Sequence, residues 1–270
     1  LFDSYDDAYF DGAIGFDILQ HYVTKIDYQN QLVTFYKKHN LAELSEEWQK
    51  LPMSVAGRIP YITAKLKNDK GGITSKQFVV DTGAPDYVYM NSHLIEGLSF
   101  PSKTFDGKLK NFDGEQTIKT TQLDFFKLGD TQFSNMTTHD LPYFEDATGV
   151  GLIGSGLLRK FNVVFDYENQ TLALKKVEGF DGNTAIDRSG LSIEPHVKGG
   201  VVKHVSANTG AAKLAIKPGD IVTHINKHQI RAKNFDSLRG LLSSEKTNLS
   251  ICWLSDESQQ CGQLTLSSRI

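Results

Sequence analysis

Residues 77–84 read QFVVDTGA, an apolar run that leads into an Asp-Thr-Gly turn. A strand with this pattern buries its apolar side chains and delivers the carboxylate of Asp81 at its end. Gly83 permits a tight turn of the backbone, and the hydroxyl of Thr82 can lock that turn. Taken alone, the stretch favours an ordinary strand followed by an Asx turn, because Asp is frequent in turns.

A second pattern is an internal repeat. Residues 12–35 read GAIGFDILQHYVTKIDYQNQLVTF, and residues 151–174 read GLIGSGLLRKFNVVFDYENQTLAL. The two segments align without gaps at an offset of 139 residues, and eight of the 24 aligned residues are identical. Each copy predicts a short helix, a strand, a turn and a second strand. We interpret the pair as a duplication in which Asp27 and Asp166 have a structural role in the turn.

Together the two patterns resemble the aspartic proteases of the retropepsin and pepsin type. D-T-G-A follows an apolar strand, an apolar-apolar-Gly element comes about 70 residues later at residues 152–154, and this element recurs in the first copy. The resemblance implies a mostly β fold with a retropepsin-like lobe that forms a closed β-barrel. It also implies that Asp81 is a catalytic aspartate, that Thr82 supports it and that Gly83 shapes its loop. A flap hairpin is expected within residues 103–121, which contain two Asp-Gly turn signals.

Aspartic proteolysis needs two neighbouring carboxylates, because one is ionised to activate water while the other stays protonated to polarise the scissile carbonyl. The sequence contains one Asp-Thr-Gly, and the repeat places the counterpart of Asp81 about 58 residues before Leu1. We therefore expect residues 1–37 to end a first lobe, and the chain alone to be inactive. The second Asp would come from that missing lobe or from a homodimer partner, as in retroviral enzymes; the repeat favours the missing lobe.

The pattern changes after residue 178, where a Gly-rich polar stretch predicts a linker. Residues 210–226 read GAAKLAIKPGDIVTHIN, which resembles the PDZ domains attached to bacterial proteases. The resemblance implies a PDZ-like β-barrel or sandwich with short helices, whose groove accepts a peptide as an added strand. Ser192 stands where Gly is usual, which leaves the loop geometry and the preference for a terminal carboxylate open. A PDZ fold that only packs on the protease is the alternative. The expected groove residues are Gly190, Leu191, Ser192 and Ile193 in the carboxylate-binding loop, and Leu238 and Leu242 on the adjoining helix.

Cys252 and Cys261 flank a polar stretch. A hairpin centred between Asp256 and Glu257 would place the two thiols opposite each other, so a disulfide is geometrically reasonable and would indicate an oxidising compartment. Two reduced core cysteines are an equal alternative. On the first interpretation we expect a periplasmic or secreted protein, with membrane tethering through the absent N-terminus left open.

Composition excludes several function classes. The net charge is −3, which gives phosphate backbones little attraction, so no nucleic-acid partner is expected. No apolar run approaches the roughly 20 residues that cross a bilayer. The Gly-x-Gly-x-x-Gly at residues 149–154 does not follow a buried strand, as a dinucleotide site requires, and His224 with His228 lacks further ligands. We expect neither a cofactor nor a metal.

The sequence thus predicts a mostly β protein in five segments. They are the lobe remnant (1–37), a linker (38–50), a complete retropepsin-like lobe (51–178), a second linker (179–185) and a PDZ domain (186–270). The predicted function is an aspartic endopeptidase that acts on peptides or unfolded proteins and uses its PDZ domain to bind or position them. A catalytically inactive adaptor that binds peptides through the same folds is the alternative. A second Asp-Thr/Ser-Gly upstream of Leu1 would support the enzyme.

Overall fold

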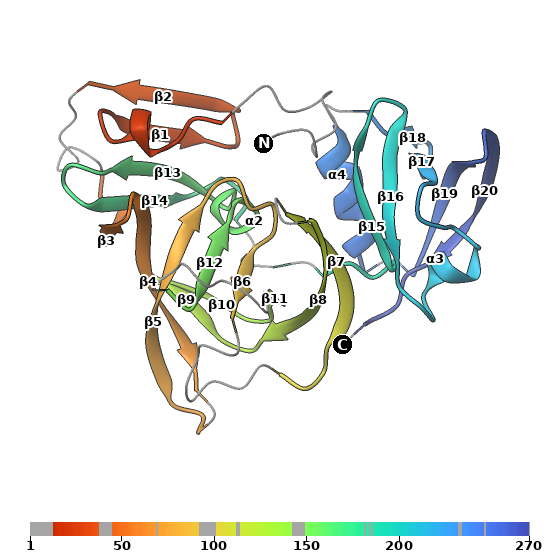
Figure 1. Cartoon of the computed structure of the whole chain (residues 1–270), viewed down its shortest axis with the longest axis horizontal. Coiled ribbons are helices and arrows are strands. Elements are labelled where there is room, and N and C mark those ends of the chain that lie inside the picture. The colour runs from red at the N-terminus through yellow and green to blue at the C-terminus, as the bar shows by residue number, and fades with distance from the viewer. Residues whose placement is uncertain are drawn as a thin grey trace. The chain divides into compact units, whose positions relative to one another are not determined.

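A computed structural model of the chain describes residues 13–37, 45–68, 70–91, 101–111, 114–141, 149–180, 182, 184, 186–231, 234–245 and 247–269. These residues are mostly in β-strands, with a few short helices, which confirms the predicted mostly β class (Figure 1). No helix among them has the length and apolar character needed to span a bilayer. Contacts divide the chain into a large unit, Ala13–Ser102 with Thr121–Thr184, and a C-terminal unit, Lys103–Thr120 with Ala185–Ile270. The five predicted segments stay a prediction.

Both copies of the repeat fold as predicted and lie in the large unit. The first copy forms α1 (Phe16–Leu19), β1 (Val23–Asp27) and β2 (Leu32–Tyr36), and the second forms β12 (Gly151–Gly154), α2 (Ser155–Leu158), β13 (Phe161–Asp166) and β14 (Thr171–Lys176). Asp27 and Asp166 close equivalent turns, since each carboxylate accepts the backbone N–H of the Asn three residues later, at 3.0 and 2.9 Å. Strand β1 pairs antiparallel with β13, so the two copies share one sheet.

The remaining strands of the large unit enclose its core. They are β3 (Gln49–Ala56), β4 (Ile59–Lys67), β5 (Ile73–Asp81), β6 (Val88–Met90), β9 (Phe126–Leu128), β10 (Thr131–Phe133) and β11 (Met136–Asp140). The sheet order is β2-β1-β13-β14-β3-β4-β5-β12-β6-β11-β8-β7, in which β7 is Phe105–Asn111 and β8 is Gly114–Leu123. Strand β9 pairs with β4, and β10 pairs with β9. Pairing among the described strands follows an open path, so the closed β-barrel expected for the lobe is not found among them. Phe78, Phe126, Phe133 and Phe161 are fully buried at the centre of this core.

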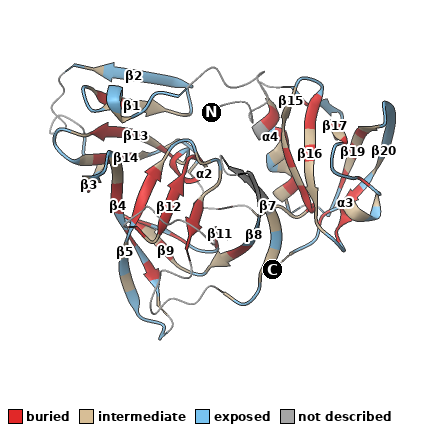
Figure 2. Ribbon diagram, viewed as in Figure 1, coloured by how far each residue is buried: buried red, intermediate tan, exposed pale blue. Residues whose placement is uncertain are grey.

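The C-terminal unit contains the hairpin of β7 (Phe105–Asn111) and β8 (Gly114–Leu123), of which β8 continues into the large unit. It also contains a sheet in the order β15-β16-β17-β19-β20, with β18 paired to β17. These elements are β15 (Leu191–His196), β16 (Gly199–Val205), α3 (Gly210–Lys213), β17 (Ile221–Ile225), β18 (His228–Gln229), α4 (Phe235–Gly240), the 3-10 helix η4 (Leu241–Ser243), β19 (Asn248–Ser255) and β20 (Ser258–Thr265). Figure 2 shows buried residues along β16 and, in the large unit, along β4, β12 and β13.

The two cysteines lie opposite each other in the β19–β20 hairpin. Its closing pair is Ser255↔Ser258, so the hairpin is centred between Asp256 and Glu257 as predicted. Cys252 pairs in register with Cys261, and the two residues form a disulfide. The bridge therefore joins neighbouring strands of the C-terminal unit.

Candidate functional site

Asp81 is the last residue of β5, and its carboxylate lies in the turn that follows. Strand β12 runs parallel to β5 and pairs Gly154 with Asp81. The backbone N–H of Gly83 donates to Asp81 Oδ1 at 2.8 Å, which holds the carboxylate in an Asx turn. Asp81 is half-buried, while Thr82 and Gly83 are exposed. The structure thus places all three predicted residues on one accessible loop, and their catalytic roles stay a prediction.

Residues 151–156 (GLIGSG, the GLIGSG segment) hydrogen-bond to the backbone that follows Asp81. Ser155 donates to the carbonyl of Ala84 twice, from its N–H at 2.7 Å and from its hydroxyl at 2.9 Å. The N–H of Gly156 donates to the carbonyl of Asp86 at 3.1 Å. A Cβ on Gly154 would lie 2.3 Å from that same carbonyl oxygen, so only glycine allows this approach. We did not predict the part that Ser155 plays; its only signal is its place after the repeated Gly.

A polar cluster that sequence reasoning missed follows the Asp81 loop. The hydroxyl of Tyr89 donates to Asp86 Oδ2 at 2.8 Å, and His139 Nε2 lies 3.4 Å from the same oxygen. Tyr89 and His139 are direct partners in the parallel pairing of β6 with β11, which places their rings 5.1 Å apart. No local sequence motif predicts this cluster, because Tyr89 and His139 come together only when β6 pairs with β11.

Burial sets the charge states in this cluster. It raises the pKa of Tyr89 well above its usual range, and the negative charges of Asp86 and Asp81 add to the effect. It also lowers the pKa of His139, against the opposing influence of Asp86. Tyr89 therefore keeps its proton and His139 is neutral at neutral pH. No group of three or more His, Cys, Asp or Glu side chains among the described residues is placed to hold a metal ion.

The β7–β8 hairpin occupies the segment expected to contain the flap. Its pairing closes at Asn111↔Gly114, so the second Asp-Gly signal lies at the tip, where Asp113 is outside the described residues. The first signal, Asp106-Gly107, lies within β7 instead, with Gly107 opposite Ile118. A hairpin is thus present, and its role as a flap stays a prediction.

The expected carboxylate-binding loop leads into β15, which is an edge strand among the described residues. Gly190 has a φ of +86°, and a Cβ there would lie 2.1 Å from Thr209 Oγ1, so glycine is required. Its N–H donates to Asp187 Oδ1 at 2.7 Å, and the N–H of Leu191 donates to Ser189 Oγ at 3.0 Å. These loop amides are therefore engaged within the domain.

The other predicted groove residues are placed as follows. The pairing of β15 with β16 shifts register between Ser192 and Ile193, so a bulge lies within the loop. Ser192 is half-buried, whereas Ile193, Leu238 and Leu242 are buried in one core cluster. Leu238 in α4 and Leu242 in η4 therefore pack in the same core cluster as Ile193 of β15, and their contact with a peptide stays a prediction.

Comparison with known proteins identifies both parts of the chain. Residues 62–157 match the family model described as aspartyl protease, and residues 174–249 match the PDZ domain. The chain therefore has an aspartyl protease-like domain followed by a PDZ domain. Among solved structures, "HtrA-type protease AlgW with decapeptide" is 10% identical over 83% of this chain and 80% of that one, with a TM-score of 0.31, which is too low to bear on function. No curated protein sequence matches the chain.

Proposed function

We propose that this chain is the Asp81-bearing part of an aspartic endopeptidase whose PDZ domain binds peptides. The observation that carries the proposal is the position of Asp81 in the aspartyl protease-like domain. Its carboxylate lies at the end of β5, on a loop that the GLIGSG segment holds through Ser155 and Gly156. Such a fixed carboxylate at an accessible turn suits general acid-base chemistry on a peptide.

In the proposed reaction Asp81 shares one proton with a second aspartate. The ionised carboxylate takes a proton from water, whose oxygen attacks the carbonyl carbon of the scissile bond, while the protonated carboxyl gives its proton to the carbonyl oxygen. On collapse of the tetrahedral intermediate, the carboxylate that gave its proton takes one back from a hydroxyl of the intermediate as the C=O re-forms. The C–N bond breaks, and the amine leaves with the proton that the other carboxyl took from water. The two carboxyls titrate as a pair, because like charges at about 3 Å do not both ionise readily.

The second aspartate is proposed to come from an upstream lobe of the same protein. The first copy of the repeat supports this arrangement, because β1 and β2 add to the sheet of the second copy through the β1–β13 pairing. A homodimer of this chain is the other source. Proteolytic activity per molecule that rises with the concentration of the chain alone would identify the homodimer. Activity that requires the upstream sequence would identify the lobe.

The test is cleavage of an unfolded protein by the chain extended upstream of Leu1. Asp81→Asn should lower kcat/KM by about a hundredfold or more, since it removes one of the two acid-base groups. Asp124→Asn is the matched control, because it makes the same chemical change at an exposed position of the same unit. Equal cleavage by Asp81→Asn and the control would contradict the proposal.

A non-catalytic adaptor is the second candidate function. It is favoured by the presence of one Asp-Thr-Gly in the sequence, since a single carboxylate cannot perform both proton transfers. The sequence upstream of Leu1 discriminates the two candidates. A second Asp-Thr/Ser-Gly there supports the enzyme, and its absence, together with an inactive extended chain that still binds peptides, supports the adaptor.

We propose an oxidising compartment, either the periplasm or the exterior of a bacterial cell, as the place where the protein works. The Cys252–Cys261 disulfide supports this location, because such bonds persist where thiols are not kept reduced. Mass spectrometry of protein purified under thiol-blocking conditions checks it. Two blocked thiols in protein taken from its native compartment would contradict the proposed location.

A further inference from the structure

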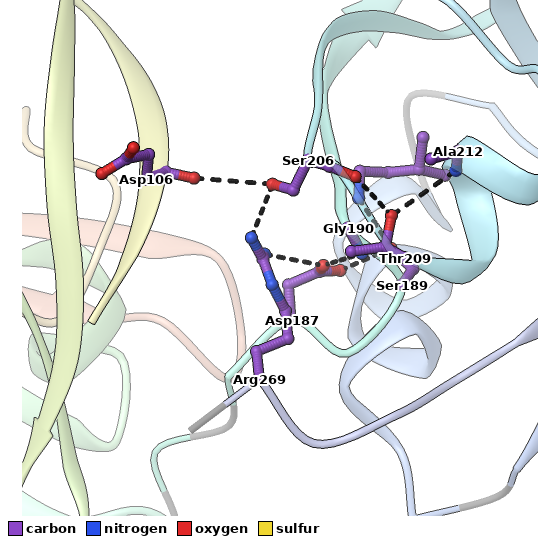
Figure 3. Close-up of polar contacts among 9 residues, drawn as sticks. Asp106, Asp187, Ser189, Gly190, Ser206, Thr209, Ala212 and Arg269 are labelled. Atoms are coloured by element: carbon purple, nitrogen blue, oxygen red, sulfur yellow. Dashed lines mark hydrogen bonds and ion pairs between the residues drawn. The ribbon is translucent and has the colours of Figure 1, made fainter. Parts of the chain in front are cut away.

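Arg269, near the end of the chain, lies at the centre of a contact network in the C-terminal unit (Figure 3). Its side chain is 8% exposed. The guanidinium carbon lies 3.4 Å from the centroid of the Phe105 ring, within range of a cation–π contact. One terminal nitrogen donates to Ser206 Oγ, and the other lies 3.5 Å from Asp187 Oδ1. One buried cation thus contacts an aromatic ring, a hydroxyl and a carboxylate.

Two of these contacts lead to the β7–β8 hairpin. Phe105 is the first residue of β7, and its ring is the face on which the guanidinium of Arg269 rests. Ser206, which accepts from Arg269, donates its own hydroxyl toward the carbonyl of Asp106 at 3.5 Å. The hairpin belongs to the same unit as the PDZ domain by its contacts. Arg269 therefore holds the base of the hairpin directly and through Ser206.

The same residues also lead to the loop that precedes β15. Asp187 Oδ1 accepts the N–H of Gly190 at 2.7 Å, and Asp187 Oδ2 accepts the hydroxyl of Ser189 at 2.8 Å. Ser206 connects Arg269 to the same loop a second time, because its N–H donates to the carbonyl of Gly190 at 2.8 Å. Asp187, which contacts Arg269, thus accepts the N–H of Gly190. Ser206, which faces the hairpin, donates to the carbonyl of Gly190.

We propose that Arg269 is a positioning residue that couples the β7–β8 hairpin to residues 187–194, which include the expected carboxylate-binding loop, so that order in one favours order in the other. The hairpin and the loop share the contacts of Arg269. When one of these two elements orders Arg269, ordering the other costs less conformational entropy. Coupling of this kind is reciprocal. If the loop takes peptides, a statement that rests on the proposed function, then peptide binding slows opening of the hairpin, and a seated hairpin strengthens peptide binding.

Hydrogen exchange of the whole chain tests the coupling without a peptide or proteolysis. Exchange is followed in peptides that cover residues 105–111 and residues 187–194, for the wild type, Arg269→Ala, Phe105→Leu and the double variant. Phe105→Leu is the decisive variant, because it changes only the hairpin and keeps an apolar side chain there. Lys217→Ala is the control, since it removes an exposed ion pair with Asp256 elsewhere in the same unit.

We expect Phe105→Leu to speed hydrogen exchange in residues 187–194 about fivefold or more, although the substituted residue lies outside this segment. A factor of this size is typical of the coupling free energies between sites in proteins. Arg269→Ala should speed exchange in both segments, and the double variant should exchange in residues 187–194 no faster than Arg269→Ala. The control should change neither segment. Faster exchange of the hairpin alone in Phe105→Leu, or effects in the loop that add in the double variant, would overturn the proposal. Because no activity is measured, this result is independent of whether Asp81 is catalytic.

Discussion

Single residues set the geometry of the Asp81 loop and of the PDZ loop. Gly154 lets β12 lie against the turn after Asp81, because a side chain there would meet backbone carbonyl oxygens that cannot move aside cheaply. In the C-terminal unit, Asp187 has a similar role by a different means, since its carboxylate holds the backbone of Gly190. Both residues can be tested by substitution with an expected sign.

Gly154→Ala should destabilise the large unit by about 1–3 kcal/mol, the usual cost of forcing an extra methyl group into a packed site. The new Cβ would lie 2.3 Å from the carbonyl oxygen of Asp86 and 2.7 Å from that of Ala84. Urea unfolding measures the effect. Gly240→Ala is the matched control, because its Cβ meets nothing within 4 Å in a helical position and should be neutral or stabilising. Equal effects of the two changes would contradict the role of Gly154.

The stability of the C-terminal unit should depend on pH through Asp187. Burial raises the pKa of this carboxyl from 3.8 to about 6, against the lowering influence of its hydrogen bonds from Ser189 and Gly190 and of Arg269. A raised pKa means that the folded state binds the proton more tightly, so this contribution is fully present below pH 3.8 and is lost as the pH rises through 6. Asp187→Asn should flatten the stability profile between these values.

Arg269→Ala should raise the pKa of Asp187 further, because it removes a positive charge that favours the ionised carboxylate. Titration followed by carbon NMR of the carboxyl measures this shift. An unchanged or lowered pKa in Arg269→Ala would show that the guanidinium does not act on Asp187 in solution.

At the scale of elements, local patterns were predictable, and contacts between segments far apart in the sequence were not. The helix-strand-turn-strand copies, the strand before Asp81 and the register of Cys252 with Cys261 all follow from residue types at short spacing. The Asp86–Tyr89–His139 cluster depends on which residue of β6 meets which residue of β11, and no short-range pattern encodes that. Arg269 and Phe105 are far apart in the sequence, so their contact has no local signal at all.

The two repeat turns offer a matched comparison at this scale. Asp166 is 1% exposed and accepts two hydrogen bonds from Asn169, so Asp166→Ala should cost about 1–3 kcal/mol by removing both bonds to a buried carboxylate. Asp27 makes the same two bonds to Asn30 in an exposed turn, so Asp27→Ala should cost clearly less, because water replaces the carboxylate. Urea unfolding of both variants measures the difference; a larger cost at Asp27 would contradict this account.

At the scale of the whole molecule, each of the two units contains one of the two tryptophans. Trp48 packs against the small cluster of Val23, Val164 and Ala173 in the large unit, and Trp253 is buried in the core of the C-terminal unit. Trp253 Nε1 has no hydrogen-bond partner among the residues that the structure describes, so Trp253→Phe removes no such bond there. Each single Trp→Phe variant therefore leaves a fluorescence reporter for one unit alone.

This arrangement allows the effect of the disulfide to be assigned to one unit. Reducing Cys252–Cys261 opens a short loop with a sequence separation of 9 residues, which in the chain-entropy account removes about 2–3 kcal/mol of stability. In Trp48→Phe, the urea midpoint reported by Trp253 should therefore fall on addition of reductant. In Trp253→Phe, the midpoint reported by Trp48 should stay unchanged, because the bridge joins β19 to β20 within the other unit. In a chain with both cysteines replaced by Ser, reductant should leave the urea midpoint unchanged in either Trp→Phe background. A parallel shift of the midpoints reported by Trp48 and Trp253 would mean that the two units unfold together.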